Sequence, residues 1–391
     1  MIKHSSKRDG RRKMMDRDSY ETFREGLRRL AESRIEPNAA RFDAEARFPE
    51  ESLQAFKELG LVSLAFPESD GGQGGDVLSQ VIALEELGRV CATSSLTLMV
   101  IWAGLVPISK HGSQQLRDEA IRPAMSGDTV ASICLTEPAG GSNLFGLKTK
   151  AEKQGGGWVL NGQKRYITNA TRSDWYTVLA RTGEKTLGLF AVHKDDPGLV
   201  LGSREKKMGI KGSPTADVTF ENCRIPTHRV IGEPEQGYQY ITDSLTWTRA
   251  LIGAQALGIA QGALDQAVKY TSEREQFGET LARFQMIRAK IADMATKIEA
   301  GRALLYSACA AIDSGSPDAR ALASMAKLFC SDSAMEITTE AVQLHGGAGY
   351  LADFPVERMM RDAKITQIYE GVNEIQRLII AKHVYDRAGA R

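Results

Sequence analysis

The sequence has no marked excess of charge of either sign and no hydrophobic run that reaches the length of a membrane span. Fifty basic residues are balanced by forty-nine acidic ones, so the formal net charge is +1. This balance gives no reason to expect a nucleic acid, a membrane surface or a strongly charged partner. We therefore expect a protein that binds no nucleic acid and does not insert into a membrane.

Cysteine and histidine are sparse, and neither is spaced like a metal site. The six histidines show no HxxxH or HExxH spacing. The cysteines form no CxxC pair and are odd in number, unlike a disulfide framework or a zinc site. The five are Cys91, Cys134, Cys223, Cys309 and Cys330. We expect buried free thiols in a reducing cytoplasm, and no metal ion.

The N-terminus lacks the apolar segment that a secretory signal requires. It is basic and polar, with Lys7, Arg8 and Arg11 among its charged residues. We interpret residues 1–18 as a mobile basic arm, whose role the sequence leaves open.

The pattern of the remaining chain changes twice. Residues 19–128 have helical periodicity, residues 129–237 contain short β-favouring runs between glycine turns, and residues 238–391 return to long helical segments. At 391 residues the chain is long enough for two or three such domains. The sequence therefore predicts an α+β multidomain protein, with an N-terminal helical domain, a middle β sandwich or barrel and a C-terminal helical domain.

Two details of this pattern can be compared with a structure. We expect Trp158–Leu160 and Arg165–Thr168 to be separate strands, because Asn161 and Gly162 between them favour a turn. Each of the long segments Leu251–Glu273 and Phe284–Ile312 is expected to be one helix.

The most informative segment lies near the C-terminus, at Ile368–Arg377. Glu370 precedes Gly371, and apolar residues then recur at helical spacing, with Ile375 and Ile379 among them. A carboxylate at such a sharp helix entry can be held rigidly and directed into a cleft. The alternative is that the acidic group only complements the helix dipole.

Four further segments could contact a ligand. Thr136 and Ser142 offer hydroxyl groups within the glycine-rich stretch LTEPAGGSN, and Thr168 lies in YITN at a strand end. Arg274 in EREQFG could neutralise a phosphate. The stretch QLHGGAGY lacks the strand and helix context of a phosphate loop. Taken singly, each segment is at least as well explained by an ordinary structural role: a turn, a strand residue, a solvated charge or a helix end.

Together, and in this order, the motifs LTEPAGGSN, YITN, EREQFG, QLHGGAGY and IYEGVNEIQR resemble the acyl-CoA dehydrogenase family. The resemblance runs from about Tyr20 to His383. It implies a C-terminal four-helix bundle, an FAD cofactor and a homotetramer that is a dimer of dimers. It also implies an acyl-CoA substrate, an electron-transferring flavoprotein as partner, and a cytoplasmic location, or the mitochondrial matrix in a eukaryote.

The resemblance assigns roles to matching positions. Thr136, Ser142, Tyr166 and Thr168 match residues beside the flavin and its pyrophosphate. The residues that match those gripping the cofactor of an adjacent subunit are Arg274, Phe277, Gln285, Gln343 and Gly347. Those assigned to the substrate are Ser142, Arg249, Tyr369 and Gly371.

Glu370 matches the catalytic base of the family's short- and medium-chain branches, so the resemblance is to these branches in particular. The chemistry needs a carboxylate, because a weakly acidic thioester α-proton must be removed while a β-hydride leaves for flavin N5. Burial by substrate should raise the pKa of this carboxyl group. The resemblance also implies that the Glu370 backbone N–H polarises the thioester carbonyl. Thr248 occupies the position where some members carry the base instead, and a hydroxyl group cannot serve as one.

Three residues depart from the family pattern: Asn143, Thr246 and Val372. Because Thr246 replaces an aspartate that contacts pantetheine in many members, desaturation of an acyl group on a carrier protein is an alternative. A flavin-dependent monooxygenase and a non-catalytic scaffold are less favoured, since Glu370 and nearly all flavin positions are retained. Trp102 is expected to shorten the acyl pocket, which favours short or branched acyl groups, and the alternative is that it packs in the core.

Overall fold

The computed structural model describes residues 17–389. Most of the predicted basic arm therefore lies outside the described residues, and Arg17 and Asp18 form the start of the first helix.

The N-terminal part is helical, as predicted, and its helices are joined by short turns. Asp76 begins α4 by accepting a hydrogen bond from the Ser79 backbone N–H, 2.8 Å away. The elements are α1 (Arg17–Leu30), a π-helical turn (Ala31–Ile35), α2 (Glu36–Ala44), α3 (Glu50–Glu58), α4 (Val77–Val90), α5 (Ala92–His111) and α6 (Gln114–Met125).

Helix α5 corrects the expectation that no apolar segment reaches the length of a membrane span. It is the one helix within residues 17–389 that is long and apolar enough to cross a membrane, by length and composition alone. The apolar stretch of this helix is wholly buried inside the protein, where the helix packs against α4, α7 and strand β1. A helix that is apolar on all sides and covered on all sides by protein is a core helix.

The middle part is a sheet with the strand order β6-β7-β3-β2-β4-β5-β8, and β1 pairs with β4 in parallel. Its strands are β1 (Ala131–Cys134), β2 (Lys150–Gln154), β3 (Gly157–Ile167), β4 (Trp175–Arg181), β5 (Leu187–His193), β6 (Leu199–Leu201), β7 (Ala216–Pro226) and β8 (Val230–Ile231). The prediction of two strands on either side of Gly162 is wrong, because β3 runs through. Its register with β7 shifts between Leu160 and Gly162, so a glycine that looked like a turn marks an irregularity within one strand.

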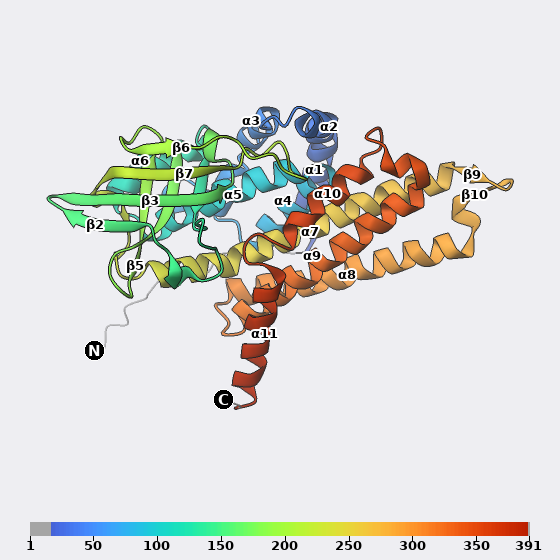
Figure 1. Cartoon of the computed structure of the whole chain (residues 1–391). Helices are drawn as coiled ribbons and strands as arrows, with labels where there is room; N and C mark the ends of the chain where they lie inside the picture. The colour runs from blue at the N-terminus through green and yellow to red at the C-terminus, as the bar shows by residue number, and fades with distance from the viewer. Residues whose placement is uncertain (1–16, 390–391) are drawn as a thin grey trace, which may run out of the picture.

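The C-terminal part consists of long helices. They are α7 (Gly237–Glu273), α8 (Gln285–Asp313), α9 (Ala319–His345), α10 (Val356–Thr366) and α11 (Asn373–Arg387), with a small hairpin of β9 (Glu275–Gln276) and β10 (Glu279–Thr280) between α7 and α8. Helices α7, α8 and α9 pack on one another, and α10 and α11 pack against α9. Figure 1 shows the sheet at one end, the β9–β10 hairpin at the opposite end, and α11 projecting away from the other helices.

Two hydrophobic cores hold these parts together. One lies within the β domain, and the larger joins the N-terminal and C-terminal helices to one side of the sheet. All five cysteines are buried and free, as predicted. The helical, sheet and helical order predicted from the sequence is confirmed.

Candidate active site

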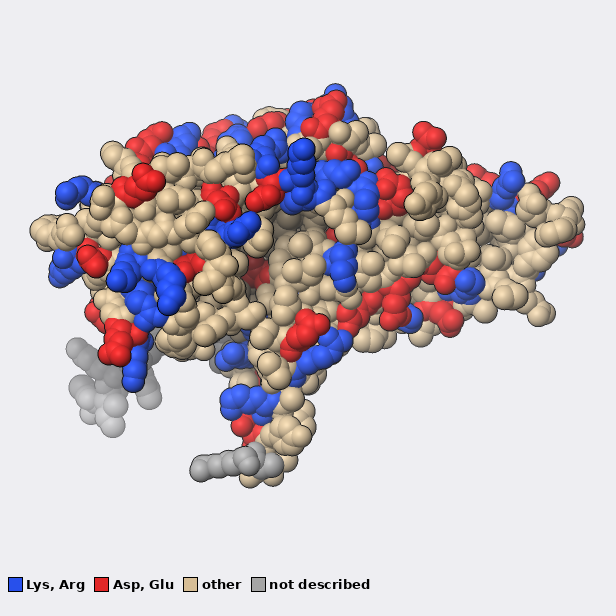
Figure 2. Space-filling model, in the orientation of Figure 1, with Lys and Arg blue, Asp and Glu red and all other residues tan. Residues whose placement is uncertain are grey.

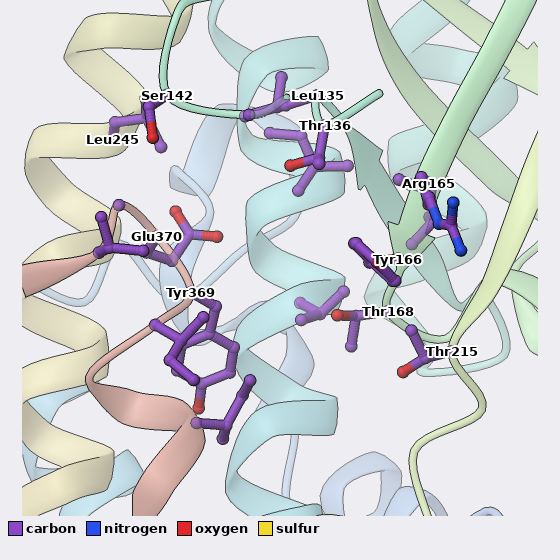
Figure 3. A pocket seen from close by; sticks show the side chains of 18 of the residues that line it. Leu135, Thr136, Ser142, Arg165, Tyr166, Thr168, Thr215, Leu245, Tyr369 and Glu370 are labelled. Carbon is purple, nitrogen blue, oxygen red and sulfur yellow. The ribbon is translucent and has the colours of Figure 1, made fainter. Parts of the chain in front are cut away.

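A cavity of about 880 Å³ lies where the β domain meets α5, α7 and the segment that leads into α11. Figure 2 shows the hollow from outside, and Figure 3 shows the side chains facing it. Eight predicted site residues line this cavity: Thr136, Ser142, Tyr166, Thr168, Arg249, Tyr369, Glu370 and Gly371. The structure thus gathers residues from four separate stretches of sequence around one space.

The Glu370–Gly371 turn forms one wall. Glu370 adopts a left-handed backbone conformation, with a φ of 53°, and Gly371 follows with a φ of 92°. Such a conformation is costly for a glutamate and concentrates at functional sites. Figure 3 shows the Glu370 carboxylate pointing across the cavity toward the wall that carries Thr136 and Tyr166. The expectation of a rigidly held carboxylate at a sharp helix entry therefore agrees with the geometry.

A hydroxyl group holds the Glu370 carboxylate. Thr248 Oγ1, on α7, donates to Glu370 Oε2 over 2.7 Å. Burial raises the pKa of Glu370, while the Thr248 hydrogen bond and the positive charges of Arg249 and Lys327 act in the opposite direction. Sequence reasoning considered Thr248 only as a position where a base is missing, and did not see it as a partner of Glu370.

Arg249 is a cation with unused donors. It is only 5% exposed, and its Nε and Nη1 atoms have no hydrogen-bond partner among the described residues. Burial, followed by the nearby charge of Arg320, lowers its pKa to about 10, and Glu370 opposes that shift. Buried guanidinium donors without acceptors are costly, so this group is poised for an acceptor that enters the cavity.

The opposite wall comes from the β domain. Thr136 follows β1, and Tyr166 and Thr168 lie at the end of β3. Tyr166 is 58% exposed and left-handed, with a φ of 59°. The Arg165 guanidinium lies over the Tyr166 ring, 4.9 Å from its centroid. This wall therefore presents two hydroxyl groups and an aromatic ring to the cavity.

A buried ion pair supports that wall. Lys164 Nζ lies 2.9 Å from Glu137 Oε1, and neither side chain is more than 2% exposed. Glu137 also accepts from the Thr149 backbone N–H over 3.0 Å. These contacts tie the loop after β1 to strand β3, so Thr136 and Thr168 keep their relative positions.

Basic side chains surround part of the cavity, and Figure 2 shows Lys and Arg gathered at the edge of the hollow. Besides Arg249, they are Arg165, Lys206, Lys207, Arg320, Arg361 and Lys364, against the acidic Glu205 and Glu370. Burial lowers the pKa of Lys207 to about 8, with Arg204 contributing. The excess of positive charge suits a polyanionic ligand such as a pyrophosphate.

The other predicted cofactor residues lie outside this cavity. Arg274, Phe277, Gln285, Gln343 and Gly347 are all exposed, on the β9–β10 hairpin and the adjoining ends of α8 and α9. Figure 1 places that hairpin at the end of the molecule opposite the sheet. They do not line the cavity of their own chain, and the resemblance had assigned them to the cofactor of an adjacent subunit.

The expectation that Trp102 shortens the acyl pocket is wrong. It is fully buried, does not line the cavity, and its Nε1 donates to the Val62 carbonyl oxygen over 2.8 Å. Trp102 therefore packs in the core, and α5 faces the cavity through Leu96, Met99 and Val100 instead.

The residues that depart from the family pattern differ in position. Asn143 and Val372 line the cavity, whereas Thr246 does not, and its hydroxyl donates to the Thr242 carbonyl oxygen over 3.0 Å. Sequence reasoning missed the cavity residue Arg320 and the buried Lys327 beneath the Glu370 turn. The sequence did indicate that Lys327 is buried, because it lies at helical spacing from Ala323 and Cys330, on a helix face that is otherwise apolar.

Comparison with known proteins agrees with this geometry over most of the chain. Three family models match consecutive segments: "Acyl-CoA dehydrogenase, N-terminal domain" over residues 17–128, the "middle domain" over 132–223 and the "C-terminal domain" over 235–385. A probable acyl-CoA dehydrogenase of Mycobacterium tuberculosis, FadE25, is 47% identical over 93% of this chain and 95% of its own length.

Two further relatives have more specific names. A cyclohexane-1-carbonyl-CoA dehydrogenase of Geobacter metallireducens is 43% identical over 93% of this chain and 97% of its own length. The solved butyryl-CoA dehydrogenase of Megasphaera elsdenii superimposes with a TM-score of 0.91 at 36% identity, covering 95% of this chain and 99% of that one. Similarity of this extent, in sequence and in fold, shows that the chain belongs to the acyl-CoA dehydrogenase family of oxidoreductases.

Proposed function

We propose that this protein is an FAD-dependent dehydrogenase that converts an acyl-CoA thioester to its trans-2-enoyl thioester. The observation that carries the proposal is the Glu370 carboxylate, which faces the hydroxyl-bearing wall of Thr136 and Thr168 across one cavity. A flat ligand on that wall and a thioester between it and Glu370 would place the α-carbon beside a base.

The residues of the cavity suit FAD. Thr136 and Thr168 offer hydroxyl groups to the polar edge of a heterocycle, and Tyr166 offers a ring for packing. The basic side chains, Lys206 and Lys207 among them, would neutralise a pyrophosphate. When bound, FAD supplies the acceptor for the β-hydride and thus for both electrons.

Residues of the chain itself remove the α-proton of the thioester. Glu370 takes the α-proton, and the electron pair of that C–H bond becomes the new Cα–Cβ double bond as the β-hydride departs. Thr248 holds the carboxylate, and we expect the Glu370 backbone N–H to donate to the thioester carbonyl oxygen, where negative charge develops. The unpartnered donors of Arg249 are available to a polar group of the entering thioester.

The acyl group is expected to be compact. Leu96, Met99 and Val100 of α5 line the cavity with branched or long apolar side chains, and we expect them to limit the depth available to an acyl chain. The names of two relatives, a butyryl-CoA and a cyclohexane-1-carbonyl-CoA dehydrogenase, fit a short or cyclic acyl group. We further propose a cytoplasmic homotetramer that passes its electrons to an electron-transferring flavoprotein.

An anaerobic titration tests the proposal. The purified protein should be yellow, and butyryl-CoA or cyclohexane-1-carbonyl-CoA should bleach its flavin absorbance faster than octanoyl-CoA does. Replacing the base, as in Glu370→Gln, should slow bleaching by roughly 100-fold or more while flavin stays bound. A colourless protein, or bleaching that Glu370→Gln leaves unchanged, would contradict the proposal. Bleaching by an acyl-carrier protein but by no acyl-CoA would favour the carrier-bound substrate.

A further inference from the structure

A lysine is buried directly beneath the turn that carries Glu370. Lys327 lies on α9 and is fully buried. Its Nζ donates to the Gly371 carbonyl oxygen over 2.9 Å and to Asn373 Oδ1 over 2.6 Å. A lysine is seldom fully buried without a partner, and here both acceptors belong to the same short segment.

These two contacts fasten a turn that the backbone does not favour. Glu370 and Gly371 are both left-handed, with φ values of 53° and 92°, so the Gly371 carbonyl lies outside any helix ladder. Gln376 Nε2 donates to that same oxygen over 2.9 Å. The strained conformation that aims Glu370 is therefore held from beneath by two side-chain donors.

Asn373 connects the turn to two further residues of α9. Its Nδ2 donates to Ser331 Oγ over 2.9 Å and to Asp332 Oδ1 over 2.7 Å. Its backbone N–H donates to the Gln367 carbonyl oxygen over 3.0 Å. The start of α11 and the residues after α10 are thus both joined to the helix that carries Lys327.

Lys327 also adds a charge close to the cavity. The charged groups that face it are Glu370 on the turn, Arg249 on α7, Asp332 on its own helix and Glu374 on α11. Burial lowers the pKa of Lys327 to about 7, and the acidic groups oppose that shift. In turn, the ammonium charge favours the ionised form of Glu370, as does the charge of Arg249.

We propose that Lys327 is a positioning residue for Glu370, which holds the Glu370–Gly371 turn in place and keeps the carboxylate ionised for proton abstraction. This inference rests on the proposed role of Glu370 as the base. Lys327 does not line the cavity, so it acts only through the turn and through its charge.

Four variants test it. Lys327→Met removes both the donor and the charge, Lys327→Arg keeps a charge, and Ser331→Ala weakens the Asn373 contacts but leaves Lys327 in place. Lys194→Met is the control, because it removes an equal charge from an exposed pair with Asp174 in the β domain. Each protein is compared at equal flavin content, with flavin reduction by saturating butyryl-CoA followed from pH 5.5 to 9.

Lys327→Met should slow flavin reduction by roughly 10- to 100-fold, since small misplacements of a base have effects of this size. The acid limb of its pH profile should move to higher pH, because loss of a nearby positive charge raises the pKa of a carboxyl group. Lys327→Arg and Ser331→Ala should keep the wild-type limb, and Lys194→Met should match wild type throughout. A Lys327→Met profile with an unmoved limb would overturn the proposal, even if the rate falls.

A second readout needs no substrate. The ionisation of Glu370 can be followed by infrared difference spectroscopy of each protein against its counterpart that also carries Glu370→Gln. The carboxyl group should titrate at higher pH in Lys327→Met than in wild type, and an unchanged titration would overturn the proposal. If no acyl thioester reduces the wild-type flavin, the proposed function fails, whereas this titration still decides the role of Lys327.

Discussion

Thr248 is the residue whose interpretation changes most between sequence and structure. At the sequence level its hydroxyl group only excluded a rival base position. In the structure the same hydroxyl group donates to Glu370 Oε2 over 2.7 Å. The Thr248 hydroxyl group therefore does more than exclude a second base at this position, because it also influences the pKa of the Glu370 carboxyl group.

The Thr248 hydroxyl group lowers the pKa of Glu370, which burial raises. Since Glu370 must be ionised to accept a proton, activity should rise as pH increases through this pKa. Thr248→Val removes the hydrogen bond and keeps the shape, so the acid limb of the flavin-reduction profile should move to higher pH. At pH 6 the rate should fall by roughly 10-fold, in line with the loss of a hydrogen bond to a charged group.

Thr248→Ser should restore the wild-type profile, because it returns the hydroxyl group. Thr296→Val is the matched control, since the Thr296 hydroxyl donates only to the Ala292 carbonyl oxygen on the exposed side of α8. A Thr248→Val profile that coincides with that of wild type would show that the hydrogen bond does not influence Glu370.

At the scale of elements, strand β3 shows that a dipeptide typical of turns can instead lie within a continuous strand. The Asn161-Gly162 pair favours a turn, yet β3 continues from Gly157 to Ile167. Gly162 has a φ of 145°, and a Cβ atom there would lie 2.6 Å from Thr149 Cα. Glycine is required at this position by backbone geometry and by the close approach of a neighbouring loop.

We therefore expect Gly162→Ala to lower the free energy of unfolding by roughly 2 kcal/mol or more, through strain and a steric clash. Because β3 carries Tyr166 to the cavity, the variant should also bind flavin less tightly. Urea unfolding followed by circular dichroism measures the first effect, and the ratio of flavin to protein measures the second. Gly156→Ala in the neighbouring β2–β3 turn is the control, because a Cβ atom there meets nothing within 4 Å, and equal stability of the two variants would contradict this account.

At the scale of the molecule, the order of helices, sheet and helices could be predicted because period and composition change sharply along the chain. The cavity could be predicted only through the resemblance, since Thr136, Tyr166, Arg249 and Glu370 are far apart in sequence. Lys327 and Arg320 escaped notice because their roles depend on where α9 lies relative to the Glu370 turn and the cavity. Helical spacing shows at most that Lys327 shares a face with apolar residues. Trp102 was misplaced for the same reason, because it lies on the face of α5 that points away from the cavity.

The far end of the helical domain exposes large apolar side chains that a lone chain would leave in water. Phe277 is 93% exposed, Tyr350 86% and Met286 77%. Such side chains gathered at one end of a molecule are typical of an interface. Phe277 also has a left-handed backbone, with a φ of 54°, in the hairpin that carries Arg274. We expect this end to complete the FAD site of an adjacent subunit in a homotetramer.

A double variant, Arg274→Ala with Phe277→Ala, should lower the ratio of FAD to protein by roughly 10-fold or more, because it removes a cation for the pyrophosphate and an aromatic contact. Each chain should still fold, since neither side chain contributes to a core. Analytical ultracentrifugation should give the mass of four chains for wild type, and Arg122→Ala on the exposed face of α6 should match wild type in both assays. A wild-type monomer that retains a full complement of FAD would contradict a shared site, because every flavin contact would then have to come from the cavity of a single chain.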